Sequence, residues 1–370
     1  MLIALNLLYL IPGVVGGTET YARSLVQALA RQDSDNEYAI FVSREAADLE
    51  ITPAANFRKV VCPVIAMSRA FRYSWEQTML PLQLLREKPA LTHSLGYVSP
   101  LAAPGPQVVS VHDVNYLGHT GRRTALGRRA FQFFVERTVQ RAERVITISE
   151  FSKGEIIRHM NVPATKVTVI HLAGKQTVTD QKEVNGAAEL LRDIGRPYIM
   201  AFSSLSAHKN IGRLIAAYTK ISHSVPHALV LVGHLPEKSS ARSEMESAET
   251  DRIHFTGHLP DADVDALMQN ASLFAFPSLY EGFGMPVIDA QQAGVPVACS
   301  SAGALPEVAG DGAVVFDPHS VDDMASALQR CLLDIDLRQT LVADGYENAR
   351  RFSWDRAARE TLRVYAEVTS

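Results

Sequence analysis

The sequence predicts an α/β protein built on two doubly wound parallel sheets. Short β-branched apolar runs alternate with helical stretches from one end of the chain to the other. Runs such as Val108–Val111 and Ala228–Val232 are apolar on both faces, which is typical of parallel strands covered by helices on both sides. A length of 370 residues indicates two domains rather than one.

Each domain has its own series of expected elements. Apolar residues with helical spacing predict helices over Tyr21–Arg31, Ile211–Lys220 and Val264–Asn270. We expect strands near 2–8, 38–43, 58–62, 90–94, 107–112, 143–148 and 166–171, and then near 198–203, 228–233, 253–256, 272–276, 296–300 and 313–316.

The segment 173–196 separates the two series and is a candidate linker. It has no strand pattern, and glycines and a proline collect in and just after it. We therefore expect an amino-terminal domain over 1–172 and a carboxy-terminal domain over 197–352. Ser353 is a suitable N-cap for a final helix over 353–370, which we expect to pack back on the amino-terminal domain. The two sheets would face a cleft lined by the carboxyl ends of their strands.

Composition excludes several classes of protein. A net charge of −4 gives no global attraction to nucleic acid or to anionic lipid. Three widely spaced cysteines in apolar sequence indicate reduced core thiols of a cytoplasmic protein. The apolar start lacks the basic region of a signal peptide, so a buried first strand is favoured over a leader. No apolar run reaches the roughly 20 residues that span a bilayer, so we expect a soluble or peripheral protein.

The most informative stretch lies between Ser278 and Asp289. Glu281 closely follows the apolar strand that ends at Pro277, and a glycine-rich turn begins at Gly282. Pro286 suits the start of a helix, so the amides of Gly282, Phe283, Gly284 and Met285 would form a phosphate site at a helix N-terminus. Amides for a phosphate, with the carboxylates of Glu281 and Asp289 for hydroxyls, suit a nucleotide sugar.

Two further loops suit a phosphate. Gly16 and Gly17 follow the first strand and open a helix, although a plain strand–helix turn explains them equally well. Lys209 lies just before the helix that begins at Ile211. A cation is unfavourable at a helix N-terminus, so an anionic group between the two is the better explanation.

Several histidines end strands. His112 stands at the carboxyl edge where ligands of such sheets bind, whereas we interpret His93 and His171 as structural. Gly233 and Gly257 are each followed by a histidine after a strand, and these loops suit either a nucleoside or ordinary turns.

No metal or cofactor site is expected. The three Asp-x-Asp triplets, at 33–35, 261–263 and 334–336, fall in polar loops or helix starts, so we assign them to solvated charge and caps. No histidine or cysteine cluster has metal-ligand spacing, and there is no Walker loop or serine elbow.

A basic segment runs from Arg122 to Arg144. It carries seven arginines interleaved with Phe131, Phe133 and Phe134. Such a helix suits an anionic membrane or a pyrophosphate-bearing acceptor. A helix that packs its phenylalanines on the sheet and leaves its arginines in water explains it equally well.

Over nearly its whole length the chain resembles the family 4 glycosyltransferases, retaining enzymes of the two-Rossmann GT-B fold. Glu-Gly-Phe-Gly at 281–284 carries most of the resemblance. Further matches are Gly-Gly-Thr-Glu-Thr-Tyr at 16–21, Ser-Val-His-Asp at 110–113, Ser-Glu-Phe-Ser at 149–152, His-Lys-Asn at 208–210, Ala-Gly-Val-Pro-Val at 293–297 and Leu-Pro-Glu-Val at 305–308. The chain looks like the bacterial branch that builds O-antigen, capsule or exopolysaccharide.

The resemblance implies a role for each matching residue. Glu281 would hold hydroxyls of the donor sugar and Asp289 the ribose, and the amides of Phe283, Gly284 and Met285 would complete the cradle. Lys209 would neutralise the diphosphate, so that no metal is needed. His112 would lie against the donor sugar, while Gly16 and Gly17 would approach the phosphate.

Two positions depart from the family pattern. Asp289 stands where relatives carry glutamate. Ser203 stands where many relatives carry an arginine, which leaves Lys209 as the main cation, with Ser203 or Ser204 donating hydrogen bonds and Arg213 a weaker substitute.

The implied activity is retaining transfer of a hexose, from UDP-glucose or GDP-mannose, to a glycan or a lipid-linked acceptor at the inner face of the membrane. The alternatives are a sugar-nucleotide epimerase on the same fold and a non-catalytic donor-binding subunit. Asp289 and Ser203 motivate the second alternative.

Overall fold

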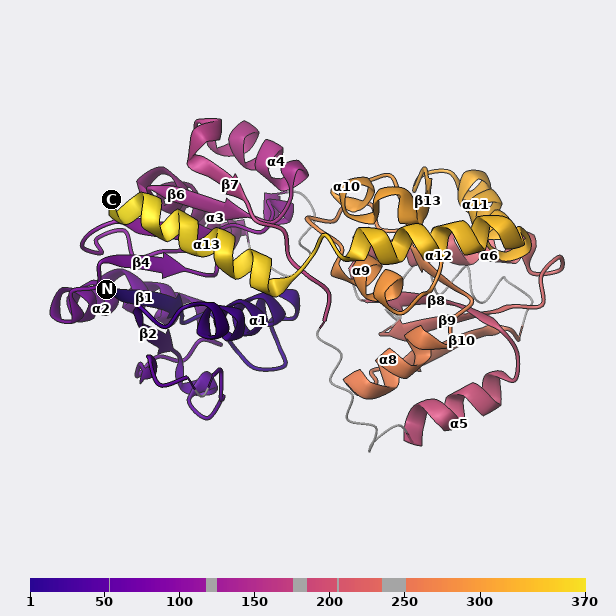
Figure 1. Ribbon diagram of the computed structural model, residues 1–370, viewed down its shortest axis with the longest axis horizontal. Coiled ribbons are helices and arrows are strands. Elements are labelled where there is room, and N and C mark those ends of the chain that lie inside the picture. The colour runs from indigo at the N-terminus through magenta and orange to yellow at the C-terminus, as the bar shows by residue number, and fades with distance from the viewer. Residues whose placement is uncertain (53, 118–124, 176–184, 205, 235–250) are drawn as a thin grey trace. The chain divides into compact units, whose positions relative to one another are not determined.

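The chain folds into two compact units, each built around one parallel sheet (Figure 1). The computed structural model describes residues 1–370 except 53, 118–124, 176–184, 205 and 235–250. Among the described residues, the first unit contains 1–117, 125–173 and 353–370, and the second runs from Gly174 to Phe352. The divisions expected after residues 172 and 352 lie within one residue of these, whereas the second unit begins at Gly174 and not at the expected residue 197.

The sheet of the first unit has seven strands in the order β3-β2-β1-β4-β5-β6-β7, all parallel. Its strands are β1 (Leu2–Leu7), β2 (Glu37–Val42), β3 (Phe57–Val61), β4 (Leu91–Ser94), β5 (Gln107–Ser110), β6 (Arg144–Thr147) and β7 (Val167–Val169). The helices are α1 (Gly17–Gln32), α2 (Arg69–Glu87), α3 (Ala125–Arg141), α4 (Glu150–Met160) and α13 (Trp354–Thr369).

The sheet of the second unit has six parallel strands in the order β10-β9-β8-β11-β12-β13. They are β8 (Tyr198–Ser203), β9 (Ala228–Gly233), β10 (Ile253–Gly257), β11 (Leu273–Phe276), β12 (Val297–Ser300) and β13 (Ala313–Phe316). The described helices are α5 (Asn185–Ile194), α6 (Ile211–Ile221), α8 (Asp261–Gln269), α9 (Met285–Gln292), α10 (Leu305–Ala309), α11 (Val321–Leu333) and α12 (Ile335–Ala349).

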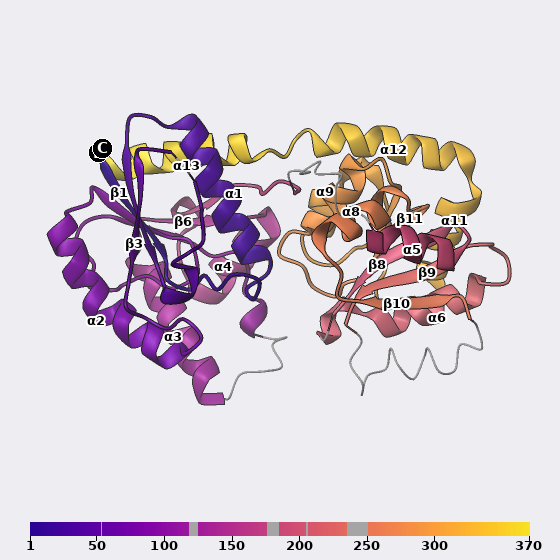
Figure 2. The same cartoon turned by 90° about the horizontal axis from the view of Figure 1, so that it is seen from below.

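Helices cover both faces of the second sheet, as the apolar runs predict. Along β8, Ile199 and Ala201 pack into a core with α6 and α11. Tyr198 and Met200 point the other way, into a core with α8 and α9. Figure 2 shows the sheet between α6 and α9. All thirteen expected strands are confirmed, with ends shifted by no more than two residues.

The segment 173–196 is not simply a linker. Residues Asn185–Ile194 form helix α5, whose last residue, Ile194, is buried in the core of the second unit. The amphipathic pattern of Leu190, Leu191 and Ile194 provides the burial that organises this helix.

The final helix, α13, belongs to the first unit, as expected. Ser353 caps it by accepting a hydrogen bond from the amide of Arg356 at 3.1 Å. α13 packs along α1 (Figure 1), and the Tyr365 hydroxyl bonds the buried His93 ring at 2.6 Å. The second ring nitrogen of His93 bonds Ser110 Oγ at 2.8 Å. Both ring nitrogens have partners, which supports a structural role for His93.

All three cysteines are free and buried, as predicted. Among the residues that the structure describes, no helix is long and apolar enough to cross a membrane.

Candidate active site

The candidate site lies at the carboxyl edge of the second sheet, where the strand order reverses. β8 and β11 are neighbours in that sheet, and the chain winds outward from them in opposite directions. Doubly wound sheets bind their ligands at such a switch point. The loops that follow these two strands contain Lys209 and Glu281.

Lys209 and Glu281 form an ion pair. The Lys209 Nζ lies 2.7 Å from Glu281 Oε1, and both side chains are mostly buried. The same ammonium lies 4.9 Å from the centroid of the Phe276 ring, close enough for a cation–π contact. The fold thus brings together two residues that are 72 positions apart in the sequence. One has a long, flexible cationic side chain, and the other has a carboxylate on a loop that the contacts below hold in place.

Backbone and amide hydrogen bonds tie the two loops to each other. Asn210 Nδ2 donates to the carbonyl oxygens of Pro277 at 3.0 Å and Pro318 at 2.7 Å. The Leu279 amide donates to the His208 carbonyl at 2.7 Å. These contacts fix the start of the 277–284 loop against the loop that carries Lys209.

Gly303 holds the backbone of Glu281 from the other side. It has a φ of +66°, and a Cβ there would lie 2.4 Å from the Glu281 carbonyl oxygen. The next amide, of Ala304, donates to that carbonyl at 3.0 Å. A larger residue at 303 would therefore push Glu281 out of position.

The glycine-rich turn opens α9 as predicted. Gly284 is the N-cap of this helix, with a φ of 110°, and a Cβ on it would lie 2.6 Å from a methyl carbon of Leu305. Phe283 is buried edge-on against the Phe352 ring at 5.7 Å. Met285 begins the helix and Pro286 follows it, so the proline lies one position later than the first helical residue.

Asp289 lies one turn into α9 and contacts the start of the 173–196 segment. Its Oδ1 accepts a hydrogen bond from the Lys175 amide at 2.7 Å. Gly174 makes room for this contact, since a Cβ there would lie 2.6 Å from the same oxygen. Withdrawal from water raises the pKa of the Asp289 carboxyl from 3.8 to about 6, against the opposing effect of the Lys175 amide.

The two serines that follow β8 differ in their hydrogen bonds. Ser203 is buried, and its hydroxyl donates to the His234 carbonyl oxygen at 2.9 Å. The hydroxyl has one proton, and this hydrogen bond uses it. The contact therefore argues against our expectation that Ser203 donates to a phosphate. Ser204 Oγ accepts from the Ser206 amide at 3.2 Å, and its own proton has no acceptor among the described residues.

Gly257 ends β10 in a left-handed conformation, with a φ of +70°. Next to it, His258 lies parallel to His234, with ring centroids 6.5 Å apart and planes 9° from parallel. The loops after β9 and β10 thus present two exposed, parallel imidazoles at the edge where β8 ends.

The remaining candidates belong to the first unit and lie at the carboxyl edge of its sheet. His112 is buried just after β5, and its Nε2 has no partner among the described residues. The Tyr21 ring meets its ring edge-on at 4.5 Å. Burial lowers the pKa of His112 to about 4, so the imidazole is neutral at physiological pH.

Gly16 is the N-cap of α1, with a φ of 59°, and no atom approaches its missing side chain within 4 Å. Gly17 is the first helical residue. The carboxylate of Glu19 accepts from the Gly13 amide at 2.8 Å and so holds the loop that precedes the helix. Sequence reasoning missed this role, whose signal is an acid in the first turn of a helix after a glycine-rich loop.

The acidic triplets serve the secondary structure. Asp334 caps α12 by accepting from the Leu337 amide at 2.9 Å, and Asp33 accepts hydrogen bonds from the turn that follows α1. Asp261 and Asp263 lie in the first turn of α8. Within the described ranges, no cluster of three His, Cys, Asp or Glu is placed to hold a metal ion.

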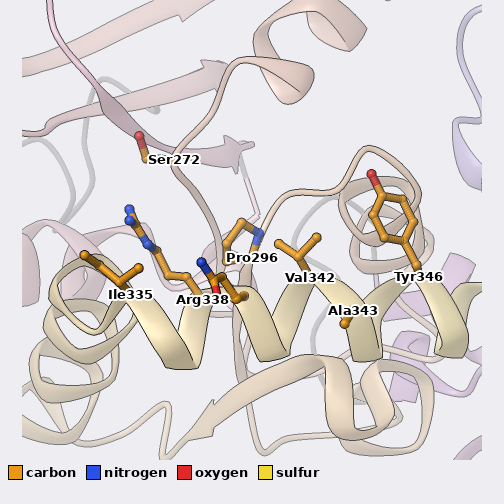
Figure 3. A pocket seen from close by; sticks show the side chains of 8 residues that line it. Ser272, Pro296, Ile335, Arg338, Val342, Ala343 and Tyr346 are labelled. Carbon is orange, nitrogen blue, oxygen red and sulfur yellow. The ribbon is translucent and has the colours of Figure 1, made fainter.

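A recess of about 550 Å³ lies elsewhere in the second unit (Figure 3). Ser272 and Pro296 in its wall directly precede β11 and β12, so it opens at the amino edge of the sheet. Side chains of α12, among them Arg338 and Tyr346, line the rest. Because the strands are parallel, this recess and Glu281 lie at opposite edges, and it is not part of the candidate site.

Two family models match the chain. The model described as glycosyl transferases group 1 matches residues 186–348, and that of glycosyltransferase family 4 matches residues 15–173. Together they cover the site loops of both units.

Among curated proteins, O-antigen chain mannosyltransferase B of Escherichia coli is 31% identical over 60% of this chain and 60% of its own length. The serotype-specific mannosyltransferase WbdA of Escherichia coli is 27% identical over 75% of this chain and 36% of its length. These alignments therefore span less than two thirds of the first relatives.

Solved structures share the fold at low identity. Sucrose-phosphate synthase from Thermosynechococcus elongatus has a TM-score of 0.73 at 21% identity, covering 99% of this chain and 98% of that one. The HepE protein of Anabaena in complex with UDP and glucose has a TM-score of 0.71 at 18% identity, covering 99% and 100%. WaaG, a glycosyltransferase involved in lipopolysaccharide biosynthesis, has a TM-score of 0.70 at 16% identity, covering 97% and 98%.

Proposed function

Because the chain belongs to the family 4 glycosyltransferases and has their GT-B fold, we propose that it is a retaining, metal-independent hexosyltransferase. It moves a hexose from a nucleoside diphosphate sugar to a glycan or a lipid-linked saccharide. The observation that carries the proposal is the Lys209–Glu281 pair at the switch point of the second sheet.

The pair supplies two opposite charges for two parts of one donor. Lys209 binds the diphosphate, and Glu281 accepts hydrogen bonds from hydroxyls of the sugar. When the donor binds, the ion pair between Lys209 and Glu281 is broken, and each side chain forms a charge-assisted hydrogen bond to the donor instead. The amides of Gly282, Phe283, Gly284 and Met285 complete the cradle at the start of α9.

Catalysis follows from where charge develops. The bond between the anomeric carbon and the diphosphate oxygen breaks, and negative charge grows on the leaving phosphate. Lys209 and the helix dipole stabilise that charge without a metal. The acceptor oxygen bonds the anomeric carbon on the same face, and its proton passes to the leaving phosphate oxygen, so no protein nucleophile is required.

His112 would act as a neutral hydrogen-bonding group against the donor sugar. Its buried Nε2 has no partner among the described residues, and a buried polar atom without a partner is costly. A sugar hydroxyl satisfies it. Gly16 and Gly17, in the same unit as His112, would let the backbone approach the phosphate.

The nucleoside would lie at the loops after β8, β9 and β10. Asp289 accepts from the ribose hydroxyls, Ser204 donates its free proton, and Gly257 lets the backbone approach the base beside the parallel rings of His234 and His258. Mannosyltransferase relatives and the UDP-bound HepE structure make GDP-mannose and UDP-glucose the favoured donors.

The O-antigen relatives support a role in polysaccharide biosynthesis, and we propose that the protein acts at the cytoplasmic face of the membrane. The basic segment Arg122–Arg144 would contact anionic lipid there. Its first arginines lie outside the described residues, while Arg141 pairs with Glu143 and Arg144 pairs with Glu367. Arg128, Arg129 and Arg137 are exposed on α3 and remain for the membrane.

A thermal-shift screen of UDP, GDP, ADP and their sugars tests the proposal, followed by product analysis with the best donor. A ligand present at 100 times its Kd stabilises the folded state by about 2.7 kcal/mol. Stabilisation followed by transfer supports the proposal. Stabilisation without transfer to any saccharide favours a donor-binding subunit, and conversion of the sugar nucleotide itself favours an epimerase.

A further inference from the structure

The recess beside α12 (Figure 3) is a concave surface that the proposed transfer does not use. It opens at the amino edge of the second sheet, opposite the edge that carries Glu281. Its volume of about 550 Å³ is within the range of small-molecule sites. Eight residues line it, whereas each partner contributes roughly 20–30 residues to a standard protein interface. The recess therefore has the size of a small-molecule site.

The packing of α12 fixes one wall of the recess. Leu341 is buried in the core of the second unit. Asn348 Nδ2 donates to Gln291 Oε1 of α9 at 2.8 Å in a buried hydrogen bond. Residues 338, 342 and 346 lie four apart and follow one another along the helix, beside this anchored face. That wall cannot turn into the core without breaking the bond to α9.

Apolar groups form the part of the recess nearest Tyr346. Figure 3 shows Pro296 and Val342 between Arg338 and Tyr346. The Tyr346 hydroxyl lies over Gly294, where a Cβ would come within 2.2 Å of the oxygen. The ring is thus held in position although Tyr346 is 44% exposed. An apolar or aromatic ligand would find a preformed surface here.

The other end of the recess carries a cation without a counter-ion. Arg338 is half-buried, and it forms no ion pair with another described residue. Figure 3 shows its guanidinium extending from α12 toward Ser272, whose hydroxyl also has no partner within the described part of the chain. A half-buried charge without a partner is unfavourable. The planar fork of N–H donors suits a carboxylate or a phosphate.

A histidine, not an acid, acts on this end of the recess. His227 directly precedes β9 at the same edge of the sheet and is 7% exposed. Burial, and then the charge of Arg338, lower the pKa of its imidazole, so the guanidinium lies close enough to affect it. The buried Nδ1 of His227 has no partner among the described residues. The structure thus places a neutral ring near Arg338, which leaves the positive charge uncompensated.

We propose that the recess binds a small organic anion, with its anionic group on Arg338 and an apolar body lying along α12 toward Tyr346. At about 1.5 Å per residue, positions 338 and 342 are about 6 Å apart and positions 338 and 346 about 12 Å apart along the helix. Two fused aromatic rings with a carboxylate have a comparable length. The recess and the donor site lie at opposite edges of the sheet, so this ligand binds together with the nucleotide sugar and does not depend on the proposed function.

The test uses 2-naphthoate as the probe and 2-naphthamide as its uncharged counterpart, with binding to the full chain measured by NMR titration. We expect 2-naphthoate to bind roughly 10- to 150-fold more tightly, because only the carboxylate forms a charge-assisted hydrogen bond with Arg338. Arg338→Gln should remove most of this difference. Val342→Thr exchanges one methyl group for a hydroxyl and should weaken binding of 2-naphthoate about fourfold.

Arg330→Gln is the matched control. Arg330 is an exposed arginine of α11 that does not line the recess, and it too forms no ion pair with another described residue. The substitution removes the same charge from the same unit. This variant should bind 2-naphthoate as the wild type does, and thermal unfolding checks that each variant is folded.

Several results would overturn the inference. The wild type binds 2-naphthoate no more tightly than 2-naphthamide, Arg338→Gln binds it as the wild type does, or Arg330→Gln loses as much affinity as Arg338→Gln. A dimer in gel filtration that Arg338→Gln disperses would mean that a second copy of the chain covers the recess.

A competition experiment keeps this site apart from the donor site. Binding of 2-naphthoate that persists in saturating UDP or GDP supports a separate site, whereas its displacement by either nucleotide would place the probe at the donor site and overturn the inference. Binding of 2-naphthoate that requires Arg338, by a protein with no affinity for any nucleotide, supports the inference and refutes the proposed function alone.

Discussion

Replacing Asp289 by asparagine should stabilise the protein and weaken the nucleotide site at the same time. The carboxyl has a pKa of about 6 in the folded protein against 3.8 when unperturbed, because it is withdrawn from water. A difference of about two pK units corresponds to about 3 kcal/mol. The folded state therefore carries up to that penalty when the carboxyl is ionised.

The pH dependence of this penalty follows from the sign of the shift. Below pH about 4 the carboxyl is protonated in both states, and the shift has no effect on stability. Between pH about 4 and 6 the unfolded state ionises first, so stability falls as pH rises. Above pH about 6 the penalty is complete, and Asp289→Asn should gain the most there.

The substitution is conservative for the contact that the structure shows. The asparagine Oδ1 can still accept the Lys175 amide hydrogen. Asp261 is the matched control, since it is exposed and pairs with the Lys175 Nζ at 3.1 Å. Asp261→Asn should change stability by no more than about 0.5 kcal/mol.

Thermal unfolding of the wild type and both variants across pH measures the effect, and calorimetry with UDP or GDP measures affinity. We expect the stability gain of Asp289→Asn to grow from pH about 4 to 7, with nucleotide affinity about tenfold lower once the charge that accepts from the ribose is gone. A gain that does not depend on pH, or a loss of stability at neutral pH, would refute the reasoning. Unchanged affinity would remove Asp289 from the nucleoside site.

Three further predictions concern the same unit. Lys209→Ala should weaken binding of the nucleoside diphosphate, measured by calorimetry, roughly 10- to 150-fold and leave binding of the nucleoside unchanged. The control Lys220→Ala, at the far end of α6, should change neither affinity. If Lys209→Ala binds the nucleoside diphosphate as tightly as the wild type does, the helix amides alone bind the phosphate. Gly303→Ala should destabilise the fold by about 1–3 kcal/mol and abolish transfer, because its Cβ would meet the backbone of Glu281; wild-type turnover in this variant contradicts the role of Gly303. Transfer should survive EDTA, and a complete loss that Mg²⁺ or Mn²⁺ restores would mean that acidic side chains hold a metal.

The strands of this fold could be predicted from the sequence alone. Parallel strands covered on both faces read as nearly continuous apolar runs, so β8 and β9 stand out without any alternation of apolar and polar residues. The carboxyl ends of β8 and β11 bring Lys209 and Glu281 to one edge of the second sheet, where Nζ and Oε1 lie 2.7 Å apart.

Other features depend on contacts that no local pattern encodes. Lys175 and Asp289, which form a hydrogen bond, are 114 positions apart. The hydrogen bond from the Ser203 hydroxyl to the His234 carbonyl depends on the position of the loop after β9. Helix α5 was not predicted, because glycines and a proline around it indicated a linker, although its apolar residues have helical spacing. On α2, apolar residues lie on two faces of the helix, and only the packed structure shows which of them is buried.

Transfer by purified protein, with and without the Glu281 carboxylate, tests the central claim most directly. Product formed from the preferred nucleotide sugar is followed by NMR, which reports both its amount and its anomeric configuration. We expect the wild type to form a glycoside with the configuration of the donor, and Glu281→Gln to fold and bind the nucleoside diphosphate but not transfer. Wild-type turnover by Glu281→Gln, or a product of inverted configuration, would contradict the account.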